Sequence, residues 1–208
     1  MIRKLSIVII IACFSFTANA QFIHSIEYKA GVSVSALEWN LSNTLVASNL
    51  FPDDYYGLTT AFNIKYWNHK YWNLSTQIGY TQCGGSTTLT YTDITGISLG
   101  EITVHERMDY INLTALLEVK YPFRKFTPSF KMGPHLDYLS SAFSYADNFN
   151  RFNYGLNIGG GIAYALNEHL FLSADYNYYW FYNKIRTSKL EVSITKNASI
   201  ILGIGYKF

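Results

Sequence analysis

The chain has 208 residues and combines 17% aromatic with only 14% charged residues, whereas soluble domains carry about 25% charged residues. Its 16 basic and 14 acidic residues form no basic cluster, so nucleic acid is not an expected partner. After residue 20 there is no run of 18 or more apolar residues, which excludes helical membrane spans.

The first 20 residues have the pattern of a secretory signal peptide. Arg3 and Lys4 supply positive charge, and an apolar stretch follows that ends at the small-residue cleavage site Ala18-Asn19-Ala20. We therefore expect residues 1–20 to be removed on export, leaving residues 21–208 as one domain with 14 basic and 14 acidic side chains. Two alternatives stay open, an uncleaved anchor and a lipoprotein modified at Cys13.

Eight later segments alternate apolar and polar side chains over about ten residues, as tilted transmembrane strands do. Because helical spans are excluded, the alternation predicts an all-β fold, an eight-stranded antiparallel up-and-down transmembrane β-barrel. In chain order the segments cover residues 26–35, 58–66, 72–80, 111–121, 126–138, 154–166, 170–180 and 198–208.

Two other folds are compatible with parts of this pattern. Three leucines between residues 111 and 119 also fit helical spacing. A soluble sandwich or lipocalin-like barrel would show the same alternation with its apolar face turned inward. Within the fifth segment, Pro128 and Pro134 remove two ladder donors, and a bulge is expected there.

The connections alternate strictly between short and long. Outer-membrane barrels have short periplasmic turns and longer extracellular loops, so both termini are expected in the periplasm and the domain in the outer membrane of a Gram-negative bacterium. Tight turns fall at residues 68–70, 122–125 and 167–169, and long loops near 38–56, 84–106, 140–152 and 182–196. The Thr-rich loop near 84–106 could instead extend the third and fourth strands and offer an edge for partner recognition by strand addition.

Aromatic residues gather at the predicted strand ends, as in the girdles at membrane–water boundaries. Tyr66, Trp72 and Tyr121 are expected at the periplasmic boundary and Trp180 at the opposite one.

The polar faces of the strands carry charges of both signs. Eight strands enclose an interior that side chains can fill, whereas diffusion pores need about 16 to 18 strands. Unpaired buried charge is costly, so we expect these side chains to form a paired network that fills the lumen. The members of this lumen polar network are Glu27, Lys29, Lys65, Glu118, Lys120, Lys131 and Asp175.

The last eight residues, Ile201 to Phe208, resemble the signal that the barrel-assembly machinery reads. Gly203 occupies the glycine position, and Tyr206 and Phe208 occupy the two aromatic positions; Ile201 departs from the pattern, where a polar residue is usual. With the expected signal peptide and eight alternating segments, the chain resembles the bacterial outer-membrane β-barrel domain family of PorT-like and porin-like proteins. The resemblance implies contact with the assembly machinery during biogenesis and, for PorT-like members, an accessory role in protein export.

No catalytic, cofactor-binding or metal site is expected from the sequence. His135 and Asp137 share a face two residues apart, which makes them the best candidates for a lipid A-modifying enzyme, but no nucleophile–base pair stands out. The adjacent His105 and Glu106 are too few for a metal ligand set. Gly159 to Gly161 lack the lysine and helix of a phosphate loop and are expected to allow curvature or close packing.

These observations predict a monomeric, non-enzymatic barrel. Its expected contacts are outer-membrane lipid, the assembly machinery and an envelope protein partner that meets the long loops or the periplasmic turns. Two alternatives are a lipid A-modifying enzyme and an accessory component of protein export.

Overall fold

The computed structural model describes residues 23–41, 51, 53–66, 69–93, 95–96, 98–142, 151–183, 185–186 and 190–208. The expected signal peptide, with Cys13, lies outside these residues. A search of the described residues finds no helix that is long and apolar enough to cross a membrane. The strands are β1 (Ile23–Leu41), β2 (Asp53–Tyr66), β3 (Trp72–Thr92), β4 (Ser98–Lys120), β5 (Phe126–Ser141), β6 (Phe152–Ala165), β7 (Leu170–Phe181), β8 (Ile185–Arg186) and β9 (Leu190–Lys207).

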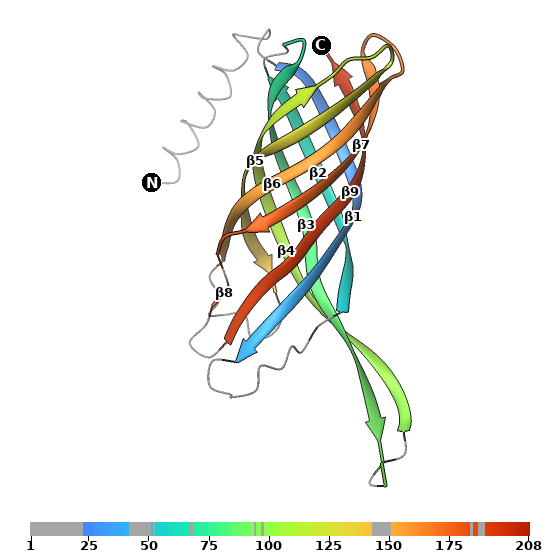
Figure 1. Cartoon of the computed structure of the whole chain (residues 1–208), viewed down its shortest axis with the longest axis vertical. Helices are drawn as coiled ribbons and strands as arrows, with labels where there is room; N and C mark the ends of the chain where they lie inside the picture. The colour runs from blue at the N-terminus through green and yellow to red at the C-terminus, as the bar shows by residue number, and fades with distance from the viewer. Residues whose placement is uncertain are drawn as a thin grey trace, which may run out of the picture.

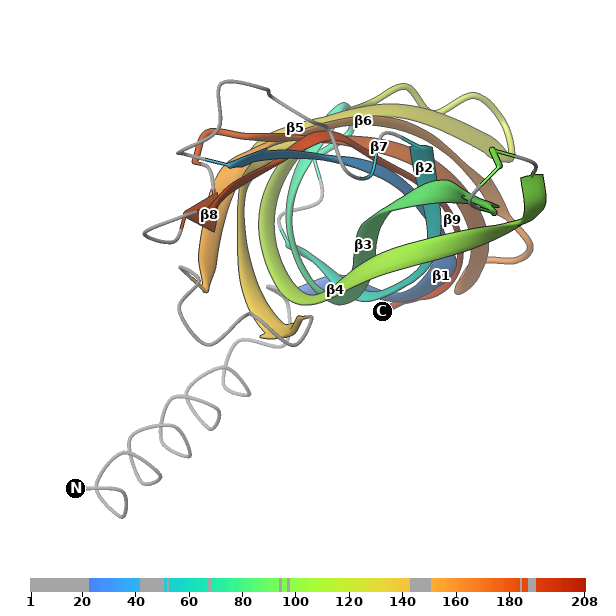
Figure 2. The same cartoon turned by 90° about the horizontal axis from the view of Figure 1, so that it is seen from below.

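Eight of these strands form a closed antiparallel ring. Each strand from β1 to β7 pairs with the next, β7 pairs with β9, and β9 pairs with β1 to close the sheet. The two-residue β8 only borders β9. Figures 1 and 2 show the tilted strands and the closed ring. The predicted eight-stranded up-and-down barrel is confirmed, and the helical alternative for residues 111–119 is wrong because they lie within β4.

Polar side chains of the ring face the lumen, and apolar side chains face outward, as expected for a barrel in a membrane. On β1, Glu27 and Lys29 point inward and are almost fully buried, whereas Tyr28 and Val32 are 44% and 49% exposed on the outer surface. The same alternation runs through the other strands of the ring that are described. A soluble barrel would bury its apolar face instead, so the lipocalin-like alternative is also wrong.

The strands are longer than the sequence pattern predicted. As expected, only a few residues separate β2 from β3, β4 from β5 and β6 from β7, but most of the predicted loop at 84–106 belongs to β3 and β4. These two strands pair from Trp72↔Val119 to Thr92↔Ser98 and project beyond the ring as a hairpin (Figure 1). Cross-strand hydrogen bonding thus continues where sequence polarity suggested a loop. The central parts of the loops near 38–56 and 140–152 lie outside the described residues.

The outer surface of β4 locates the extracellular edge of its apolar band. Outward residues from Ile111 to Val119 are apolar and exposed. The next exposed side chain on this strand beyond Ile111 is the charged Arg107, which forms an ion pair with the buried Asp109 at 3.1 Å. Because charged side chains are costly in hydrocarbon, the membrane-spanning part of β4 ends near residue 110.

The two prolines of β5 do not produce the expected bulge. Both point outward, and the β5–β6 register runs without interruption from Phe126 to Tyr138. The β4–β5 register is the same on both sides of Pro134, and it shifts only between Asp109 and Tyr110, at the extracellular end. Prolines are tolerated here because the missing donors do not change which residues pair.

Candidate functional site in the barrel interior

The centre of the lumen holds one carboxylate between two lysines. Asp175 on β7 accepts hydrogen bonds from Lys29 Nζ at 2.5 Å and from Lys131 Nζ at 2.6 Å. All three side chains are at most 4% exposed. Gly161 on β6 makes room for them, because a Cβ there would overlap the Asp175 carboxylate. The glycine run at 159–161 therefore allows close packing, one of the two roles expected for it.

Glu27 extends the same network toward the periplasmic end. Its carboxylate accepts hydrogen bonds from Ser173 and, at 3.2 Å, from Asn63. The ammonium groups of Lys29 and Lys65 lie 3.4 and 3.7 Å from it.

Lys65 connects this group to a second carboxylate. Its Nζ lies 3.4 Å from Glu118, which also accepts a hydrogen bond from Asn73 at 3.1 Å. Six of the seven predicted members thus form one chain of ion pairs, and Lys120 lies at its end, at the mouth of the barrel. Buried charges lose several kcal/mol of hydration, so their pairing is needed for the fold.

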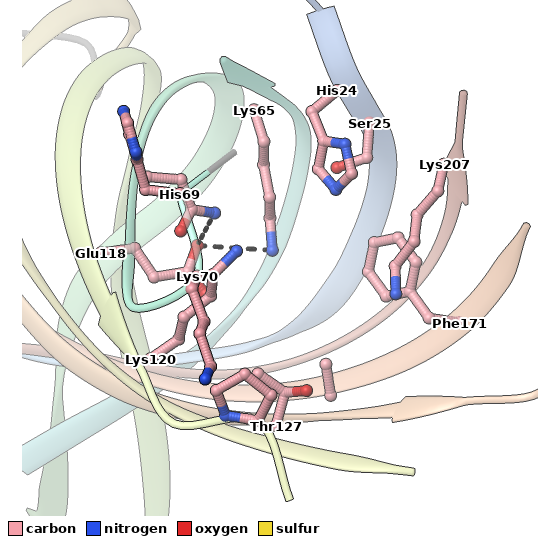
Figure 3. Close-up of a pocket in the computed structure, with 13 residues that line it drawn as sticks. His24, Ser25, Lys65, His69, Lys70, Glu118, Lys120, Thr127, Phe171 and Lys207 are labelled. Atoms are coloured by element: carbon pink, nitrogen blue, oxygen red, sulfur yellow. Dashed lines mark hydrogen bonds and ion pairs between the residues drawn. The ribbon is translucent and has the colours of Figure 1, made fainter. Parts of the chain in front are cut away.

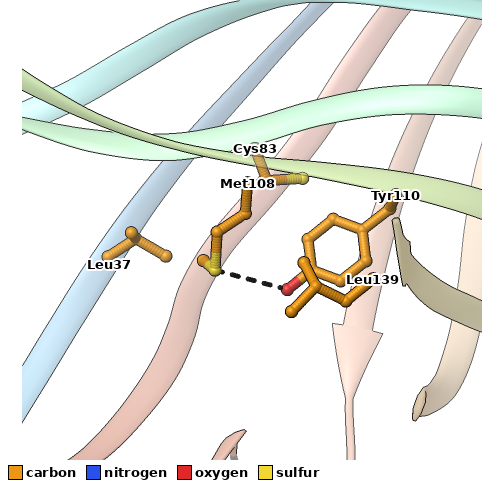
Figure 4. Close-up of a cluster of buried hydrophobic side chains, with 5 residues drawn as sticks. All are labelled: Leu37, Cys83, Met108, Tyr110 and Leu139. Atoms are coloured by element: carbon orange, nitrogen blue, oxygen red, sulfur yellow. Dashed lines mark hydrogen bonds between the residues drawn. The ribbon is translucent and has the colours of Figure 1, made fainter. Parts of the chain in front are cut away.

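Toward its extracellular end the lumen also holds an apolar layer. Five inward side chains form a buried cluster, the apolar layer, shown in Figure 4: Leu37, Cys83, Met108, Tyr110 and Leu139. The Tyr110 hydroxyl donates to Met108 Sδ at 3.6 Å and accepts from Asn153 at 3.3 Å. This layer was not predicted from the sequence. A signal was present, because Leu37 and Cys83 are apolar and continue the inward-facing alternation beyond the predicted strand ends.

The periplasmic mouth forms a basic pocket of about 280 Å³ (Figure 3). Its walls combine residues from all eight strands of the ring with residues from the turns. Lys65 and Lys207 each place their Nζ 5.4 Å from the centroid of the Phe171 ring. Gly205 makes room for this ring, because a Cβ there would overlap it. The other charged or titratable residues that line the pocket are His24, His69, Lys70, Glu118 and Lys120.

Comparison with known proteins identifies the family. The model of the outer membrane protein beta-barrel domain family matches residues 19–178. The chain belongs to this family. The predicted family is thereby confirmed, and the protein is a bacterial outer-membrane β-barrel. No curated protein matches its sequence.

Two solved outer-membrane proteins have the same fold. OprG of Pseudomonas aeruginosa is 15% identical, with 90% of this chain and 97% of that chain covered and a TM-score of 0.57. Neisserial surface protein A is 15% identical, with 88% and 97% covered and a TM-score of 0.53. At 15% identity, these similarities show only that the chain shares their fold.

The candidate catalytic residues His135, Asp137 and Ser140 do not form a site on the lipid-facing surface of this outer-membrane β-barrel. His135 is 3% exposed inside the lumen, where its ring contacts Tyr179 and Phe181 edge-on at 5.4 and 5.0 Å. Its Nε2 lies 3.7 Å from Asp137 Oδ2. Ser140 donates to the backbone of Asp109 instead of approaching the histidine. A lipid substrate outside the barrel could not reach the imidazole.

His105 and Glu106 point to opposite sides of β4. His105 is exposed and its ring packs edge-on at 6.1 Å from Tyr55, whereas Glu106 is buried. Glu106 lies beyond the apolar band of β4, and burial raises its pKa to about 7. Among the described residues, no group of three or more His, Cys, Asp or Glu could hold a metal ion.

The residues predicted to form the girdles lie at the strand ends, on the outer surface of the barrel. Trp72 and Tyr121 lie at the periplasmic ends of the strands and are 38% and 64% exposed, and Tyr66 lies at the same end. Trp180 lies near the other end of β7 and is 60% exposed. At the terminus, Tyr206 and Phe208 are also exposed on the outside, whereas Gly203 faces the lumen.

Proposed function

We propose that this protein is a non-enzymatic, monomeric outer-membrane barrel that contacts an envelope or surface partner through its extracellular face. The observation that supports this proposal is the β3–β4 hairpin beyond the membrane. A hairpin of this length is not needed to close the barrel, because β3 pairs with β2 only up to Ser86 and β4 pairs with β5 only from Asp109. A projecting element on a rigid scaffold is suited to binding.

The composition of the hairpin favours contact with another protein. Four of its large apolar side chains are 47% to 71% exposed: Leu89, Tyr91, Leu99 and Ile102. Neither β2 nor β5 covers the outer edges of the hairpin at residues 87–92 and 98–108. Exposed edges of this kind accept an added strand from a partner, with the apolar side chains supplying contact area.

The interior supports a role without transport or catalysis. The ion-paired network and the apolar layer occupy successive levels of the lumen, and His135 is enclosed between aromatic rings. The lumen of an eight-stranded barrel filled in this way leaves binding to its ends.

Site-specific photo-crosslinking in intact cells tests the proposal. A photo-crosslinking residue at Leu99 should give a discrete adduct, and the same residue at Lys125, on a periplasmic turn, should not give that adduct. Replacing residues 89–102 by Asn-Gly joins the paired residues Thr88 and Thr103 through a two-residue turn. This variant should lose the crosslink that a photo-crosslinking residue at Thr87 gives in the full-length hairpin, and it should keep its heat-modifiable gel mobility. Absence of a discrete adduct at Leu99, with the barrel correctly assembled, would contradict the proposed contact.

A further inference from the structure

We propose that the basic pocket at the periplasmic mouth binds a phosphate group. The pocket is lined by four lysines, Lys65, Lys70, Lys120 and Lys207, and by two histidines, His24 and His69. Glu118 is the one carboxylate among the described residues that line it. Residues 21–208 carry equal numbers of basic and acidic side chains, so this positive excess is a local property of the mouth.

The excess contrasts with the centre of the lumen, where carboxylates lie between the lysines. Glu118 already interacts with Lys65 at 3.4 Å and with Asn73 at 3.1 Å. Lys65 also lies 3.7 Å from Glu27, so the positive excess toward the opening comes from the other basic residues of the lining. Toward the opening no further carboxylate of the described lining separates the lysines. The mutual repulsion of these ammonium groups is an electrostatic cost that a bound anion would relieve.

Two of these lysines, from different strands, line the open space of the pocket next to the same aromatic ring. Lys65 comes from β2 and Lys207 from β9, and the Phe171 ring lies 5.4 Å from each ammonium nitrogen. Phe171 is 3% exposed, and its ring fills the space that Gly205 leaves. Figure 3 shows Lys65, Lys120 and Lys207 approaching the pocket from different parts of the wall. An aromatic face favours cations without neutralising them, so Phe171 leaves the charge of Lys207 available to a ligand. Lys65, in contrast, is already paired with Glu118 and Glu27.

The number of lysines favours phosphate over a single carboxylate. A phosphate monoester carries about two negative charges and three acceptor oxygens, whereas a carboxylate carries one charge. Lysine binds phosphate as a point charge and needs no bidentate geometry, which suits several lysines converging from different strands. The pocket volume of about 280 Å³ accommodates a phosphate group with part of its carrier. The carrier could be a phospholipid headgroup of the inner leaflet or a soluble phosphate ester.

Calorimetric titration with inorganic pyrophosphate tests this site. The purified protein in a nonionic detergent should bind the probe saturably at low salt, and affinity should fall as salt rises. The double variant Lys120→Gln/Lys207→Gln should bind about tenfold more weakly, whereas Lys120→Arg/Lys207→Arg should keep most of the affinity. Lys125→Gln, an exposed lysine of the neighbouring turn that does not line the pocket, should bind within about twofold of wild type.

The outcomes separate the proposal from its alternatives. Heat-modifiable mobility identifies variants that fail to fold, and Lys120→Gln alone replaces the double variant if Lys207 proves necessary for assembly. Lack of saturable binding by wild type, or an equal loss in Lys125→Gln, would overturn the site. Competition by phosphatidic acid in phosphatidylcholine nanodiscs would support a lipid source, and competition by glycerol 3-phosphate alone would support a soluble one. The variant with residues 89–102 replaced by Asn-Gly should bind pyrophosphate normally, because this site is independent of the hairpin.

Discussion

The lumen of this barrel has two sections that fill the same kind of space with opposite chemistry. The ion-paired section around Asp175 consists of charged side chains with defined partners, whereas the apolar layer around Leu139 consists of side chains that pack by shape. Both sections point inward from the same ring of strands. Facing inward in a transmembrane barrel therefore does not mean facing water, and each level of the lumen is stabilised like a protein core of its own kind.

The largest expected effect comes from removing the shared carboxylate of the ion-paired section. Asp175→Asn would leave Lys29 and Lys131 buried beside a neutral amide, which we expect to lower the free energy of unfolding by about 3–5 kcal/mol. Denaturant titration in detergent measures this change. As a matched control, Asp54→Asn breaks the exposed Lys196–Asp54 pair and should leave the unfolding midpoint unchanged. Equal effects of the two variants would remove the energetic distinction between the buried network and a surface pair.

Truncation in the apolar layer should cost less and depend on volume. Leu139→Ala creates a cavity beside Met108 and should lower the free energy of unfolding by about 2–4 kcal/mol. Leu139→Met keeps the volume and should cost less than about 1.5 kcal/mol. The same denaturant titration compares the two variants. A similar loss in both would mean that this layer depends on specific contacts, as the ion-paired section does.

A substitution at Gly203 tests whether a residue of the C-terminal assembly signal is also needed for packing inside the lumen. A Cβ at this position would lie 2.5 Å from Ser173 Oγ and 2.9 Å from Glu27 Oε1, so Gly203→Ala should disturb the ion-paired section by about 1–3 kcal/mol. Refolding into detergent without the assembly machinery isolates this effect. Wild-type stability of the refolded variant, combined with poor assembly in cells, would assign Gly203 to the signal alone.

The smallest expected effect concerns pH at the extracellular end, near the apolar layer. Burial raises the pKa of Glu106 to about 7 from an ordinary value of 4.5, so folding favours its protonated form. Its contribution to stability is therefore most favourable below about pH 4.5 and is lost as the pH rises through about 7. Glu106→Gln should flatten this part of the pH profile of the unfolding midpoint. An unchanged profile would show that Glu106 stays ionised in the folded protein.

Individual residues show how far sequence reasoning reaches. Glu27, Lys29 and Asp175 were identifiable because each lies on the polar face of an alternating segment, and alternation is a local property of the chain. Their contacts were not identifiable: Asp175 meets Lys29 across 146 positions of sequence. The place of Lys120 at the mouth of the barrel likewise depends on the register between distant strands.

The sequence by itself determined the number and order of the membrane strands, the side of each strand that faces lipid, and the family, because these follow from a period of two and from short motifs. Only the tertiary structure decided that β3 and β4 continue as a paired hairpin, that the lumen changes from ion pairs to an apolar layer, and that Gly205 makes space for Phe171. Strand pairing brings residues from separate parts of the chain to the same level of the barrel. That level depends on the tilt and stagger of the closed ring, which no single segment encodes.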